Sequence, residues 1–119
     1  MSNFKKDVLD EVGDETIESI VIGEFGWGRG WGRGVDEPGF GEGGVTLVPW
    51  EKRGHCLPVE EALELLNYDY DTNFGAPSCH AIYVWTGKRI IWITQYDGST
   101  SLDSAPRNPT DVWPEMPGG

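Results

Sequence analysis

Four side chains in the C-terminal half of the sequence could together hold a small anionic ligand. Trp85 and Gln95 fall near strand ends, Asp97 lies in an Asp-Gly turn, and Arg107 lies in a segment that two prolines hold extended. An aromatic platform, a carboxylate that accepts hydrogen bonds and a guanidinium that holds an anion suit a nucleotide-like ligand. Core packing, turn formation and an acidic neighbour explain Trp85, Asp97 and Arg107 equally well, so both interpretations stay open.

A tandem WGRG repeat in residues 27–34 offers a second candidate contact site. It carries Trp27, Arg29, Trp31 and Arg33, the residue types that stack on bases and meet phosphates in Arg-Gly segments. Four acidic residues flank these two arginines, which opposes binding to a phosphate backbone. We therefore do not expect direct nucleic-acid binding. Contact with a protein is favoured, because Trp and Arg are frequent anchors of protein interfaces.

One motif resembles a calcium site but lacks part of the ligand set. Residues 69–73 copy the first ligand positions of a calcium loop, yet the required glycine would fall at Phe74 and the bidentate glutamate at His80. Asp and Asn are also ordinary turn formers after a helix. We predict no metal ligands here.

Two Cys-His neighbours, His55-Cys56 and Cys79-His80, have poor spacing for zinc. Adjacent side chains in a strand point to opposite faces, whereas zinc ligand pairs leave two or more residues between their members. We predict that both cysteines are small buried residues and that both histidines are surface or edge groups.

The sequence carries no established catalytic motif. His80, Asp97 and a hydroxyl at Ser99 or Thr100 supply the residue types of a triad, but no nucleophile elbow, Walker lysine or paired-His helix accompanies them. We predict a protein that is not an enzyme, with no catalytic residues and no cofactor.

The charge distribution limits the classes of partner. The 119-residue chain has a net charge of −11, and residues 1–79 carry sixteen acidic against six basic side chains, whereas residues 80–107 are close to neutral. Acidity opposes contact with nucleic acid and with anionic membrane surfaces. The two cysteines are too few for a disulfide scaffold, and the sequence contains neither a signal peptide nor a membrane-spanning run. We expect a cytoplasmic protein.

The hydrophobic pattern predicts one α+β domain over residues 16–110, a small antiparallel sheet covered by one helix. Residues 1–15 suit either a short helix with Val8, Leu9 and Val12 on one face or a flexible acidic N-terminus, and we take the latter. Residues 23–44 contain ten glycines and are predicted to form a long loop. Residues 111–119 are predicted to be a flexible tail. The remaining elements are strands at 16–22 and 45–50, a helix at 58–66, and a meander of strands at 81–86, 89–96 and 101–104.

Period-two alternation assigns side chains to the two faces of the meander. It places Tyr83 and Trp85 together, opposite Ile82 and Val84. In the next strand, Ile91 and Ile93 are expected on one face and Ile90, Trp92, Thr94 and Tyr96 on the other.

The runs LNYDYDTNFGAPSCHAIYVWT and QYDGSTSLDSAPRNPTD, with the opening of residues 21–27, resemble a group of uncharacterised small proteins of actinobacterial tailed phages. The likeness covers roughly residues 20–110, with YDG at 96–98 and PRNP at 106–109 as its most specific parts. It implies a phage gene and a place in the host cytoplasm. A fainter likeness is to phage anti-Thoeris sponge proteins, which sequester a cyclic ADP-ribose signal between subunits. That resemblance implies ligand-binding roles for Trp85, Gln95, Asp97 and Arg107; the WGRG repeat and the strong acidity depart from it.

The expected function is that of a phage accessory protein that acts by binding. Its partner would be a host protein, engaged for inhibition or counter-defence through the WGRG repeat and the acidic surface. The alternative is a sponge for a cyclic ADP-ribose-type nucleotide, in which case a homo-oligomer would be expected. A virion decoration protein is a further alternative.

Overall fold

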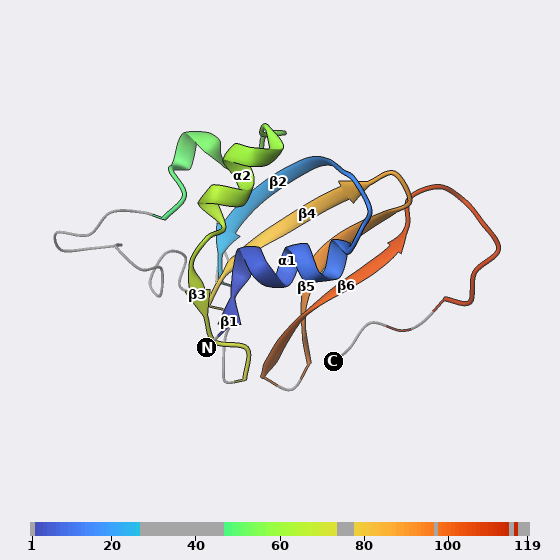
Figure 1. Cartoon of the computed structure of the whole chain (residues 1–119). Helices are drawn as coiled ribbons and strands as arrows, with labels where there is room; N and C mark the ends of the chain where they lie inside the picture. Colours follow the sequence, from blue (N-terminus) through green and yellow to red (C-terminus); the bar gives the residue numbers. More distant parts are fainter. Residues whose placement is uncertain (1, 27–46, 74–77, 97, 115, 117–119) are drawn as a thin grey trace, which may run out of the picture.

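The computed structural model describes residues 2–26, 47–73, 78–96, 98–114 and 116. A four-stranded antiparallel sheet with the strand order β2-β4-β5-β6 carries two helices on one face (Figure 1). A second, two-stranded pair joins β1 to β3. The described elements are β1 (Ser2–Asn3), α1 (Phe4–Val12), β2 (Ile17–Phe25), the 3-10 helix η1 (Trp50–Lys52), α2 (Val59–Leu65), β3 (Asp69–Tyr70), β4 (His80–Thr86), β5 (Arg89–Tyr96) and β6 (Ser99–Pro106).

The predicted meander is confirmed. β4, β5 and β6 follow one another as antiparallel neighbours, and Gly98 has the positive φ of 80° that a tight turn after β5 requires. β6 begins two residues earlier and ends two residues later than predicted, because the alternation of its short polar side chains is too weak to mark its ends.

The two faces of β4 also match their assignment. Ile82 and Val84 are buried, whereas Tyr83 is 55% exposed. The core lies between this inner face and the two helices, where Ile20 and Ile22 of β2 and Ile91 of β5 complete it. The other face of the sheet is called the outer face below.

Helix α2 agrees with the predicted helix to within one residue at each end. Pro58 is its N-cap and Leu66 its C-cap. Ala62 and Leu66 are buried, and Val59 and Leu63 pack against the core from partly buried positions. The apolar stripe therefore faces β2 as its spacing requires.

The N-terminal segment corrects two predictions. Residues 4–12 form a helix rather than a flexible segment, so two helices cover the sheet instead of one. Its stripe is Phe4, Val8 and Val12, each buried, and the predicted stripe is wrong at Leu9, which is 40% exposed. The helix starts at Asn3, whose Oδ1 accepts from Lys6 N at 2.9 Å. Phe4 extends the apolar stripe to a third turn, which is why this short helix has enough area to dock.

The predicted edge strand at 45–50 is wrong for the residues that the structure describes. Residues 47–49 form a bend that leads into η1. The β2 edge is instead bonded by the following segment, where Gly54 N donates to Ile22 O at 2.8 Å and Leu57 N donates to Ile20 O at 3.1 Å. Pro49 lacks the N–H that an edge strand would use there.

The predicted Gly-rich loop at residues 23–44 is wrong for residues 23–25, because β2 continues to Phe25. Residues 27–44, like residues 45 and 46, lie outside the described part of the chain. Described tail residues 111–114 and 116 are exposed and belong to no helix or strand. Within the described part, no helix has both the length and the apolar character needed to cross a membrane.

The burial of α1 predicts opposite outcomes for two adjacent side chains. Val8→Ala should lower the free energy of unfolding by about 2 kcal/mol, because it removes buried methyl groups and leaves a cavity. Leu9→Ala should cost less than about 1 kcal/mol, because that side chain is already partly in water. Urea denaturation of both variants measures the difference. Equal losses, or a larger loss at position 9, would contradict the observed helix orientation.

Candidate interaction surface

The three described members of the predicted nucleotide site do not converge within one chain. Trp85 pairs with Ile90 near the start of β5, whereas Gln95 lies five residues further along, roughly 16 Å away at about 3.3 Å per residue. The two also face opposite sides of the sheet by alternation. Gln95 Nε2 donates to Thr100 Oγ1 at 2.8 Å. Asp97 lies outside the described residues.

Arg107 lies at the Trp85 end of the sheet and is tied to its own chain. Its Nη1 donates to the Glu18 carboxylate and, at 3.0 Å, to the carbonyl of Thr86. Its backbone N–H donates to Lys88 O at 2.9 Å. These contacts fit the alternative interpretation of Arg107, in which the arginine pairs with an acidic neighbour. The other predicted contact residues, Trp27, Arg29, Trp31 and Arg33, lie outside the described residues.

The predicted burial of the two Cys-His pairs is right for two side chains and wrong for the other two. Cys79 is buried and His55 exposed, as predicted, but Cys56 is exposed and His80 is fully buried. Strand alternation places His80 on the inner face, where Tyr68 satisfies it: the Tyr68 hydroxyl lies 2.7 Å from Nδ1 and accepts from the His80 backbone N–H at 2.9 Å.

In the calcium-like loop, the Asp71 carboxylate accepts a hydrogen bond within its own turn. Asp71 Oδ1 accepts from Asn73 N at 2.9 Å, which is the turn-forming role of an Asp after a helix. In the described part of the chain, no group of three or more His, Cys, Asp and Glu side chains is arranged to hold a metal ion.

A cluster that the sequence did not reveal anchors α1 to the β4–β5 hairpin. Its members are Glu11, Glu15, Thr86 and Arg89, called the Arg89 clamp below. Arg89 Nε donates to Glu15 at 2.9 Å, Nη1 donates to Glu11 at 2.8 Å, and Nη2 donates to the Glu11 carbonyl. The Thr86 hydroxyl donates to Glu15 at 2.7 Å. The hydrogen bond from Thr86 and then the charge of Arg89 lower the pKa of Glu15, although desolvation opposes them. No spacing rule links residues that lie more than 70 positions apart.

The outer face of the sheet carries a row of side chains that become more polar from β2 to β6. The register aligns Val21, Tyr83, Trp92 and Asp103 as successive cross-strand neighbours on β2, β4, β5 and β6. Trp85 follows on the same face, with its ring centroid 5.8 Å from that of Tyr83. The row therefore runs from an aliphatic side chain through two aromatic ones to a carboxylate.

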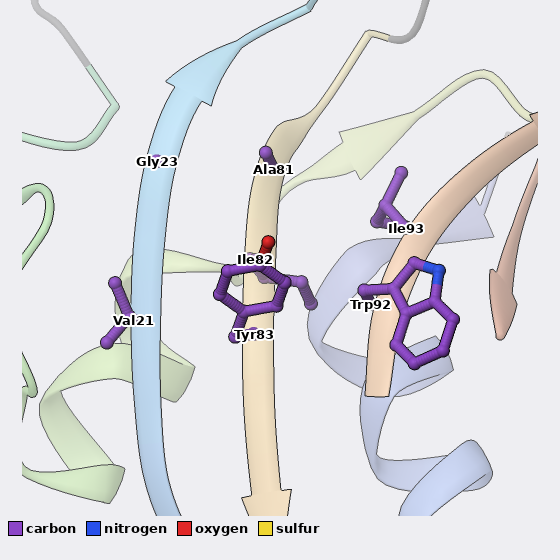
Figure 2. A pocket seen from close by; sticks show the side chains of 7 residues that line it. All are labelled: Val21, Gly23, Ala81, Ile82, Tyr83, Trp92 and Ile93. Carbon is purple, nitrogen blue, oxygen red and sulfur yellow. The ribbon is translucent and has the colours of Figure 1, made fainter. Parts of the chain in front are cut away.

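A shallow groove lies beside this row, with a volume of about 230 Å³ (Figure 2). Tyr83 and Trp92 stand on adjacent strands, and the helices lie on the far side of the sheet. Gly23 and Ala81 supply the low part of the surface, because neither has a side chain beyond Cβ. A Cβ added at Gly23 would lie 3.5 Å from the Ala81 Cβ, at ordinary van der Waals contact, so the two residues are neighbours across the strands.

The edges of the sheet are less open than this face. The β2 edge is bonded to residues 54 and 57, as described above. On β6, Thr100 N donates to Thr72 O at 2.8 Å and Ser104 N donates to the Asp103 carboxylate at 2.8 Å. Pro106 has no N–H to offer. Three positions of β6 thus cannot donate to an added strand, which is how natural sheets protect an edge.

No family model matches the chain, and comparisons with curated proteins and with solved structures find no match. The types and alternation of Tyr83, Trp85 and Trp92 were visible in the sequence, but the absence of any described element over them was not.

Burial raises the pKa of the Cys79 thiol to about 12, so the two cysteines should differ in reactivity. A thiol reagent at about pH 8 should label Cys56 rapidly in the native protein and label Cys79 only after unfolding. Absorbance of the released product counts the thiols. In Cys56→Ser, rapid labelling of native protein would contradict the buried position of Cys79.

The Arg89 clamp predicts a pH dependence of stability. Because the pKa of Glu15 is lowered in the folded protein, its carboxylate stabilises the fold above the ordinary Glu pKa. That contribution is lost as the pH falls through the lowered value. The stability difference between wild type and Glu15→Gln should therefore shrink between about pH 6 and about pH 3 in urea titrations. Thr86→Ser keeps the hydroxyl and should keep the wild-type profile. A pH-independent difference would contradict this role of Glu15.

Proposed function

We propose that this protein is a non-enzymatic binding module that engages a protein partner through the outer face of its sheet. The observation that carries the proposal is the row of Tyr83 and Trp92 with neighbouring Trp85, which no described element covers. Both helices pack against the inner face. Tyr83 is exposed and both tryptophans are partly exposed, and a sheet face with such aromatic side chains is a typical interaction site.

The composition of this face favours a protein partner. Tyr and Trp offer much contact area at a small cost in side-chain entropy, and they dominate the binding energy of many interfaces. The groove beside Tyr83 and Trp92 gives a partner side chain a place to insert. Because the β2 and β6 edges are largely occupied, docking on the face is favoured over addition of a strand.

We favour a protein partner over a nucleotide because the described members of the predicted nucleotide site do not come together. Gln95 lies far from Trp85 and on the other side of the sheet, and Arg107 is paired with Glu18. The resemblance to small phage proteins suggests where the partner would be found: in the cytoplasm of an infected bacterial host, where this protein would act as an inhibitor or in counter-defence.

Site-specific photocrosslinking tests the proposal. A photoreactive phenylalanine analogue at position 83 should crosslink a defined host protein in cells, whereas the analogue at position 9 on α1 should not. Both positions are exposed apolar sites, so the second controls for random collision. Identical crosslinks at both positions would contradict docking on the outer face.

The captured protein then allows a quantitative test. Tyr83→Ser should weaken its binding about thirtyfold, the effect of losing about 2 kcal/mol at an interface hot spot, as measured by calorimetry. Leu9→Ser removes an apolar side chain from the opposite side and should leave the affinity unchanged. Unaltered binding by Tyr83→Ser would overturn the proposal.

A further inference from the structure

Resting on the proposed function, we infer that the outer face receives a basic segment of its partner. In this arrangement, an arginine side chain lies across Tyr83 and Trp92 and its guanidinium pairs with Asp103. The register supplies the geometry, because these three residues are successive neighbours on β4, β5 and β6. Adjacent strands lie about 4.8 Å apart, so the row from Tyr83 to Asp103 spans roughly 10 Å.

The described side chains of the outer face carry negative charge only. Alternation from the paired positions assigns thirteen described residues of the four strands to this face, and Asp103 is the single charged side chain among them. The face has no lysine or arginine within this set. The thirteen residues are Ser19, Val21, Gly23, Ala81, Tyr83, Trp85, Ile90, Trp92, Thr94, Ser99, Ser101, Asp103 and Ala105.

Asp103 is available for an incoming cation. One of its oxygens, Oδ1, accepts from Ser104 N at 2.8 Å, and none of the ion pairs between described residues involves this carboxylate. Arg107, the cation that follows β6, is paired with Glu18. A carboxylate can accept several hydrogen bonds, so the contact with Ser104 leaves capacity for a guanidinium.

Arginine suits this row better than other side chains. Its apolar stem can lie on the aromatic surface while its planar head stacks on Trp92 and bonds a carboxylate. The same protein contains such a contact elsewhere, where the guanidinium carbon of Arg53 lies 3.8 Å from the centroid of the Trp50 ring. The net charge of −11 adds a long-range attraction for a basic partner.

A matched pair of peptides tests the inference on the full-length protein. Acetyl-Leu-Arg-Leu-amide should shift the indole N–H of Trp92 and the amide of Tyr83 in nitrogen–proton NMR spectra, with a saturating dependence on concentration. The counterpart with citrulline has nearly the same shape without the charge and should bind about fivefold more weakly or worse. Equal affinity of the two peptides, or no shift at these residues, would overturn the inference.

A matched pair of variants distinguishes a direct contact of the peptide with Asp103 from attraction by the net charge of the protein. Asp103→Asn and Glu60→Gln change the net charge equally, and Glu60 is an exposed residue of α2. Asn keeps an oxygen that can accept from Ser104 N, so the strand should fold as before. Asp103→Asn should weaken arginine-peptide binding about fivefold, and Glu60→Gln should leave it nearly unchanged. Equal effects would show bulk electrostatics and overturn the inference.

Two further outcomes would overturn the inference in different ways. If the partner captured through position 83 binds Asp103→Asn as tightly as wild type, docking on the outer face stands and the basic segment does not. If sedimentation shows a dimer that Tyr83→Ser dissociates, the face belongs to a second copy of this chain. Loss of partner binding in both Tyr83→Ser and Asp103→Asn, but not in Glu60→Gln, is the expected result.

Discussion

The buried apolar stripe of α1, together with the Arg89 clamp, determines which side of the sheet this helix covers. Arg89 holds both the carboxylate and the carbonyl of Glu11 at the end of α1, and it reaches Glu15 in the connection to β2. These contacts add to the burial of Phe4, Val8 and Val12, which hold the helix on the inner face. Because α2 packs against the same face, the described helices all lie on one side (Figure 1). On the outer face, Tyr83 is exposed and Trp85 and Trp92 are partly exposed.

This one-sided coverage explains how a small acidic chain can present a specific surface. Most of its charge lies outside the aromatic row, where it favours solubility and long-range attraction of basic partners. The interactions that the row itself can make act at short range, because its aromatic rings and the groove beside them require contact and shape complementarity. A partner would thus be attracted by the charge of the whole molecule and selected by the outer face, with Asp103 as the place where the two effects meet.

The candidate site was only partly visible in the sequence. The residue types that form the outer face could be assigned to it from alternation, because successive side chains of a strand point to opposite sides. Trp85 was correctly placed beside Tyr83, but it was grouped with Gln95, which the register puts at the other end of β5. It was also grouped with Arg107, which lies at the Trp85 end but pairs with Glu18. His80 was taken for an edge group, although its ring is buried against Phe25 and Tyr68. Chain proximity says little about such partners, because they come from other elements.

By itself, the sequence determined the local structure: helix α2, the meander of β4 to β6 and the inward side of Ile82 and Val84. Each follows from short-range periodicity and turn chemistry, which act within a few residues. Only the tertiary structure decided that residues 4–12 form a packed helix, that the β2 edge is bonded by residues 54 and 57, and that both helices share one face. The physical reason is distance along the chain. The free energy that orders these segments comes from contacts such as the packing of Phe4 on Tyr70, between residues that no local pattern connects.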